Sequence, residues 1–198
     1  MEFDYRSALG HYIRMQQIYE SIARDYLEDA KHKFRGYKNL AEKALEQVAD
    51  EEFFVENATD ANSVAIVIKH IAGNQRSRWR NFLTEDGEKP DRDRDTEFEI
   101  NEDDRESLMR SWESGWALLF ETLEELSPAD LGRTVTIRGE DHTVLQAMNR
   151  QLMHYAFHIG QIVILAKIFR GADWKSLTVP KSGSKEFNKE MFRKFGDR

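Results

Sequence analysis

Apolar residues recur at helical spacing along most of this chain. From Leu9 to Ala30 they form one stripe, with charged residues on the other side. This spacing predicts an amphipathic helix with one buried face. Gly36 interrupts the pattern, and the apolar spacing then resumes, which predicts a separate short helix over residues 37–48.

Two further segments show the same spacing. Residues 61–83 are apolar on most sides in their first half, which predicts a helix at the centre of the fold. Residues 108–123 place large apolar side chains on one face, and this pattern stops near Pro128. We interpret the tryptophans of both segments as packing residues.

The last long segment begins at Thr143, which has Gln146 three residues on as a capping-box partner. The predicted helix runs to about Phe169, is ended by Gly171 and is apolar nearly all round. We expect such a helix to be enclosed or to face a partner subunit. Just before it, residues 133–138 alternate and are β-branched, which predicts a short strand or hairpin arm.

Long helices separated by one long connection predict an all-α four-helix bundle, with a small β excursion. The residues 1–198 form a single predicted domain. Within it, residues 84–104 are rich in charge and predict a connecting loop in solvent, and residues 172–198 predict a C-terminal tail.

The amino-acid composition excludes several classes of site and binding partner. The 198 residues include no cysteine, which excludes disulfides, thiolate zinc sites and a cysteine nucleophile. A net charge of −7 leaves no broad phosphate-binding surface, so we do not expect a nucleic-acid partner. The N-terminal residues do not resemble a signal peptide, and the longest apolar runs are five residues. We therefore expect a cytoplasmic protein without a membrane partner.

Three of the six histidines lie in the two most apolar predicted helices. His154 and His158 are four residues apart, so both side chains leave the same helix face, and His70 lies in the 61–83 helix. Two such imidazoles and a third from a facing helix make a three-histidine metal site with open positions. The alternative is three core histidines, each hydrogen-bonded to a neighbour.

Polar residues accompany these histidines at helical spacing. Asn74 and Arg78 follow His70 by one and two turns, and Gln161 follows His158 by three residues. We expect Asn74 and Gln161 to orient a substrate or a ligand imidazole, and Arg78 to meet a carboxylate at a pocket mouth. The alternative is ordinary polarity at a surface or helix end.

Several enzyme classes lack their motifs here. The sequence contains no Glu-x-x-His ligand pattern, no Gly-x-Ser-x-Gly, no phosphate-binding loop and no dinucleotide fingerprint. No acidic residue lies one turn from His70, His154 or His158 on its own helix, so an obvious general acid or base is also missing.

The stretches NSVAIVIKHIAGN and HYAFHIGQ resemble the DinB-like (YfiT-like) metal-binding four-helix bundles. Further stretches, RSRWRNFLTEDGEKPDRDRDTEFE, ESGWALLFETL and WKSLTVPKSGSKEFN, resemble one uncharacterised bacterial branch of that superfamily. The resemblance implies that His70, His154 and His158 bind a divalent metal. Members of known activity are often transferases or isomerases that use low-molecular-weight thiols, and many are dimers.

The resemblance and the residues together leave two function classes open. In the first, the protein is a metal-dependent transferase that acts on a small molecule with an external low-molecular-weight thiol. In the second, it binds a metal or small ligand without turnover, as a stress-associated protein; a metal-dependent hydrolase is a further alternative. Zinc and nickel are the metals expected first, with iron as a further candidate. We also expect a homodimer, because the outer side of the last helix needs cover.

Overall fold

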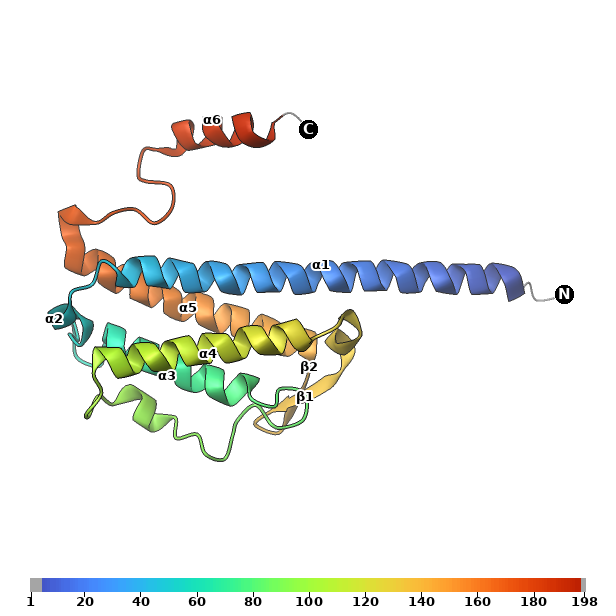
Figure 1. Cartoon of the computed structure of the whole chain (residues 1–198), viewed down its shortest axis with the longest axis horizontal. Helices are drawn as coiled ribbons and strands as arrows, with labels where there is room; N and C mark the ends of the chain where they lie inside the picture. Colours follow the sequence, from blue (N-terminus) through green and yellow to red (C-terminus); the bar gives the residue numbers. More distant parts are fainter. Residues whose placement is uncertain (1–4, 197–198) are drawn as a thin grey trace.

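Four long helices form a bundle in the computed structural model, which describes residues 5–196 (Figure 1). These are α1 (Tyr5–Leu45), α3 (Val64–Trp79), α4 (Arg105–Glu125) and α5 (Val144–Arg170). The shorter elements are α2 (Asp50–Phe53), η1 (Asp95–Phe98), η2 (Pro128–Gly132), β1 (Thr134–Ile137), β2 (Glu140–Thr143), η3 (Gly171–Asp173) and α6 (Ser184–Phe195). The predicted all-α bundle with a small β excursion is confirmed.

The core lies between these helices. α3 packs mainly against α4, α1 packs against α5, and α3 also contacts α5, which joins the two pairs. All four helices contribute fully buried aromatic or apolar side chains, among them Phe34, Ile68, Trp116 and Tyr155. The interpretation of the tryptophans as packing residues is confirmed, because Trp79, Trp112 and Trp116 are at most 1% exposed.

Helix α1 differs from the prediction in two ways. It runs without a break through Gly36, so the separate helix predicted over 37–48 is wrong. A lone glycine costs a helix only about 1 kcal/mol. Here Phe34 and Ala41, on either side of Gly36, are both buried against the bundle, which holds the helix together across it.

The second difference concerns the apolar stripe of α1. From residue 9 onward, burial begins only at Ala23, because the first half of the helix extends past the rest of the bundle (Figure 1). The exposed apolar side chains of this half are Leu9, Tyr12, Ile13, Met15, Ile18, Tyr19 and Ile22, which are between 44% and 62% exposed. We call these seven residues the α1 apolar stripe. The sequence predicts that these residues lie on a buried face, and this prediction is wrong for the single chain.

The hairpin and the start of α5 follow the prediction. β1 pairs antiparallel with β2, with Thr134 opposite Thr143. Arg138 and Gly139 form the two-residue turn with positive φ at both, as a type I′ turn requires. Thr143 Oγ1 accepts a hydrogen bond from Gln146 N at 3.1 Å, and Gln146 Oε1 accepts one from Thr143 N at 2.8 Å, so the capping box is confirmed.

Residues 84–104 connect α3 to α4 and most of them are exposed, but, contrary to the prediction from the sequence, the segment is not solvated throughout. This segment contains η1 and packs against α3, and Lys89 and Glu97 within it are only 3% and 5% exposed. Charged side chains can be buried when each has a partner of opposite charge, and this segment supplies both signs. The C-terminal tail also contains an element that was not predicted, the exposed helix α6.

The segment Val144–Asp173 is long and apolar enough to cross a membrane, although its longest unbroken apolar run is five residues. Its apolar residues lie on two sides of the bundle helix. One side is buried in the core, and the other leaves Met153, Phe157, Ile164 and Ile168 between 52% and 69% exposed. The outer side of α5 is therefore an uncovered apolar surface of the single chain.

Candidate metal centre

The three predicted histidines converge between α3 and α5. One nitrogen from each of His70, His154 and His158 lies within 4.8 Å of the other two. The Nε2 atoms of His70 and His154 are 3.2 Å apart. His70 and His158 are 4% and 8% exposed, and His154 is half-buried. The three histidines therefore come together, as their spacing on the two helices predicts.

Hydrogen bonds orient two of the rings. His70 Nδ1–H donates to Glu97 Oε2 at 2.8 Å, and His158 Nδ1–H donates to Gln161 Oε1 at 3.0 Å. A proton held on Nδ1 leaves Nε2 of a neutral imidazole with a free lone pair. Both rings therefore offer Nε2 to the space between the histidines, which is how outer partners prepare histidine ligands for a metal.

Two of the histidines, His154 and His158, are held in the neutral form that metal binding needs. Burial, together with the nearby His158, His70 and two arginines, lowers the pKa of His154 to about 3. Burial also lowers the pKa of His158, against the opposing effect of its Gln161 hydrogen bond. An imidazole that stays unprotonated at neutral pH keeps its lone pair for a cation.

Glu97 is the partner that sequence reasoning missed. Its carboxylate is buried, and besides the bond from His70 it accepts two from Arg92, from Nε at 2.8 Å and Nη2 at 2.9 Å. Burial by itself would raise the pKa of Glu97, but the hydrogen bonds and charges of His70 and Arg92 outweigh it and lower the pKa. Glu97 therefore stays ionised and fixes the His70 ring.

A glycine on α3 makes room for this carboxylate. A Cβ atom built at Gly73 would lie 2.7 Å from Glu97 Cδ, closer than real Cβ contacts allow. Any larger residue at this position would push Glu97 away from His70, one turn earlier on the same helix. The absence of a side chain at Gly73 thus lets Glu97 lie against α3 and hold the His70 ring in place.

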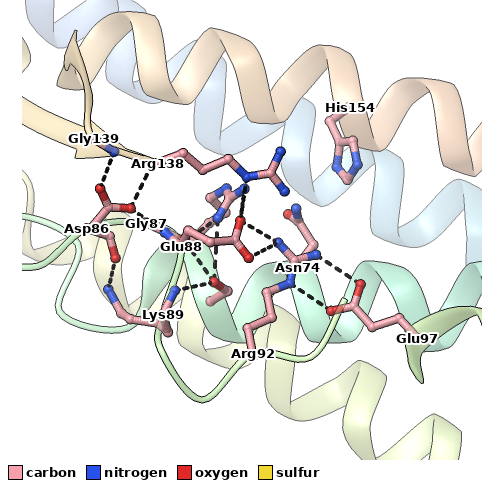
Figure 2. A network of polar contacts seen from close by, with 12 residues as sticks. Asn74, Asp86, Gly87, Glu88, Lys89, Arg92, Glu97, Arg138, Gly139 and His154 are labelled. Carbon is pink, nitrogen blue, oxygen red and sulfur yellow. Dashed lines mark hydrogen bonds and ion pairs between the residues drawn. The ribbon is translucent and has the colours of Figure 1, made fainter. Parts of the chain in front are cut away.

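The same segment connects the site to the hairpin (Figure 2). Glu88 accepts hydrogen bonds from Arg78 Nη2 and Arg138 Nε, each at 2.9 Å, and pairs with Arg92 at 3.3 Å. Asp86 accepts from the backbone N–H groups of the Arg138–Gly139 turn, both at 2.8 Å. Together with the hydrogen bond from the Glu88 backbone N–H, these bonds lower the pKa of Asp86 to about 2, although burial opposes them. The network runs from the turn to Glu97, with His154 projecting from α5 above it (Figure 2).

A cavity of about 490 Å³ opens beside the histidines. The three residues predicted to accompany them, Asn74, Arg78 and Gln161, all line it. Asn74 Oδ1 accepts a hydrogen bond from the Tyr155 hydroxyl at 3.1 Å. Arg78 is only 5% exposed and is already bonded to Glu88 and the Gly87 carbonyl, so it forms part of the wall rather than a free cation at the mouth. The substrate roles predicted for these three residues stay predictions.

The donor set fits a divalent metal. Two imidazole nitrogens that share a tetrahedral zinc at about 2.0–2.1 Å stand roughly 3.3 Å apart, close to the 3.2 Å between His70 and His154. Within residues 5–196, His154 Nδ1 is buried without a hydrogen-bond partner, and His154 Nε2 faces His70 Nε2. His70, His154 and His158 are thus the residues that would hold the ion.

Comparison with models of protein families gives one match, to a family described as a protein of unknown function (DUF1572), over residues 21–183. This range contains all three histidines, the hairpin and the segment with Arg92 and Glu97. It leaves out most of the α1 apolar stripe and the whole of α6. No curated protein and no solved structure matches the chain.

Proposed function

The chain belongs to the DUF1572 family, and because that family has no assigned function, we propose one from the site itself. The protein binds one divalent metal ion through His70, His154 and His158. The observation that carries this proposal is the convergence of three imidazoles, two of which have Nδ1 held by a hydrogen-bond acceptor. Zinc and nickel suit three imidazole ligands best, and iron is a further candidate.

We also propose that the family is a branch of the DinB-like superfamily. The support is the combination of a four-helix bundle with one histidine on α3 and a His-x-x-x-His pair on α5. The sequence stretches around His70 and His154 carry the same resemblance.

As an enzyme, the protein would transfer a low-molecular-weight thiol to a small molecule. The chemistry that a loaded three-histidine site supplies is a lowered pKa for a thiol or a water molecule. The thiol comes from outside, because the chain has no cysteine. Glu97 and Gln161 keep His70 and His158 oriented, and Asn74 offers a polar group to whatever occupies the cavity.

One observation favours thiol chemistry over hydrolysis. Among the residues that the structure describes, no aspartate or glutamate lines the cavity beside the histidines. Hydrolysis at a metal is usually helped by a general base within hydrogen-bond reach of the water. A thiol loses its proton more readily than water does, so it depends less on such a base. Binding without turnover is the remaining alternative.

The proposal is tested by titrating zinc into chelator-treated, untagged protein. His154→Ala should weaken zinc binding by about 100-fold or more, because the site loses one of three ligands. Far-UV circular dichroism should show unchanged helix content, since the core residues remain. His32→Ala, on the exposed side of α1, is the matched control and should bind zinc as the wild type does. Equal affinity in His154→Ala and wild type would contradict the site.

Turnover is then measured on the zinc-loaded protein with a panel of small thiols and electrophilic acceptors. A thioether product that requires both the thiol and His154 supports the transferase. Tight zinc binding without any product across the panel would leave the binding protein as the better description.

We further propose that the protein is a homodimer. The support is the amount of apolar surface that one chain leaves uncovered, on the α1 apolar stripe and on the outer side of α5. A second copy carries the same surfaces, so a twofold arrangement lets each cover the other.

A further inference from the structure

We propose that the cavity beside the histidines recognises a small anion, a molecule bearing a carboxylate or phosphate group, and that Arg94 and Arg150 bind that group. This inference rests on the proposed function in one respect, since the rest of the ligand would reach the three histidines. Binding of the anionic group depends on the two arginines and does not require a bound metal ion.

The charge around the cavity is strongly positive. Five arginines line it: Arg78, Arg92, Arg94, Arg138 and Arg150. Within residues 5–196, two carboxylates bind these guanidinium groups. Glu88 pairs with Arg78, Arg92 and Arg138, and Glu97 pairs with Arg92. Five positive charges against two negative ones leave an excess of three in a chain whose net charge is −7. A concave site of the opposite sign to the whole protein concentrates anions.

Two of the five arginines carry most of this excess. Arg94 and Arg150 are exposed, and within residues 5–196 neither makes an ion pair with a carboxylate. All of the other three contact Glu88. Elsewhere within residues 5–196, Arg80, Arg105 and Arg110 each pair with a carboxylate, whereas Arg24 and Arg193 are exposed without one. What distinguishes Arg94 and Arg150 is that both line the same cavity, beside the three histidines.

Arg94 and Arg150 both lie close to the histidines. Arg150 precedes His154 by four residues on α5, so the two side chains leave the same face one turn apart. The guanidinium of Arg94 lies 4.8 Å from the centre of the Phe98 ring, which in turn lies 4.8 Å from the His70 ring. An oxyanion held by these two arginines would thus lie at the side of the three-histidine cluster.

The cavity size sets the scale of the ligand. A volume of about 490 Å³ is that of a small-molecule site. Guanidinium groups match both carboxylates and phosphates through paired hydrogen bonds. The inferred substrate class is therefore a small molecule with an acidic group at one end and a metal-binding or reactive group at the other.

Isothermal titration of zinc-free protein at low ionic strength tests the inference, with inorganic phosphate and succinate as separate probes and succinamide as the uncharged counterpart. The variant is Arg94→Gln with Arg150→Gln. Removing one charge-assisted contact should weaken anion binding by about tenfold, so the double variant should lose about 100-fold. The matched control is Arg24→Gln with Arg193→Gln, which removes the same charge from exposed positions outside the cavity.

The outcomes are distinct. Binding of phosphate or succinate that the cavity variant loses and the control keeps supports the inference, and the probe that binds tells phosphate from carboxylate. Equal binding by the two double variants would overturn it, as would the absence of binding up to about 10 mM of either anion. A parallel zinc titration separates the two proposals. Zinc binding without anion binding refutes only this inference, and anion binding without zinc binding refutes only the metal site.

Discussion

Two regions of this molecule depart from the usual distribution of polar and apolar groups, in opposite directions. Around the histidines, charged side chains such as Arg92 and Glu97 are buried. Along the first half of α1, apolar side chains such as Met15 and Ile22 are exposed. The first region is satisfied within the chain, because the buried charges bind each other. The second is not, since the side chains of the α1 apolar stripe stay 44–62% exposed in the single chain.

The two regions differ in what stabilises them. A buried carboxylate costs several kcal/mol unless partners replace its water, and here His70 and Arg92 do so. An exposed apolar helix face costs little for folding but favours association. The buried charges around the histidines are thus compensated within one chain. We expect the exposed apolar side chains of α1 to be covered only when two chains associate.

The largest expected effect concerns the buried ion pair. Arg92→Ala leaves Glu97 with His70 as its remaining partner, and we expect the free energy of unfolding to fall by about 3–5 kcal/mol. Denaturant unfolding of the zinc-free protein measures it. The matched control is Arg110→Ala, which removes an exposed pair with Glu106 and should cost about 0.5 kcal/mol or less. Similar losses for both variants would show that the buried region does not depend on its internal pairing.

The next effect concerns the α1 apolar stripe. Met15→Glu puts a charge into the proposed contact between two copies, and we expect the association free energy to weaken by about 2–4 kcal/mol. Light scattering over a range of concentrations should then give 23.2 kDa for the variant and twice that for the wild type. Gln17→Glu adds the same charge on the opposite side of the helix, where the residues are polar, and should stay dimeric. A wild type that is monomeric throughout would refute the dimer.

The smallest effect separates stability from metal binding. Gly73→Ala displaces Glu97 from His70, and we expect zinc affinity to fall by about 10- to 100-fold, as for other losses of a ligand's supporting group. Helix propensity alone would make the same change stabilising by up to about 1 kcal/mol. Gly160→Ala, on the exposed side of α5 with open space around it, shares the propensity gain without the displacement. Equal zinc affinities for the two variants would contradict the proposed role of Gly73.

The parts that the sequence predicted are those set by local rules. Periodicity located the bundle helices, and the capping box at Thr143 fixed the start of α5. The convergence of His154 and His158 follows from a spacing of four, and His70 joins them because α3 and α5 pack together. Gly36 misled the prediction because tertiary packing on both sides of a glycine outweighs its local cost.

The parts that could not be predicted depend on contacts between distant segments. Glu97 lies in a stretch without periodicity, residues 84–104, where 14 of the 21 residues are charged. Its burial requires the missing side chain at Gly73 and the partner Arg92, neither of which a pattern of residues marks as special. Helix α6 is different, because Phe187, Met191 and Phe195 recur every four residues and could have revealed it.

The length of α1 has a consequence for how the molecule moves through water. A helix of 41 residues is about 60 Å long at 1.5 Å per residue. A compact chain of 198 residues has a radius of gyration of only about 16 Å. The projecting half of α1 therefore increases hydrodynamic drag without adding mass, and even a single copy will elute early from a sizing column. Sedimentation equilibrium is free of this effect, and small-angle scattering will register the projection directly as a long maximum dimension.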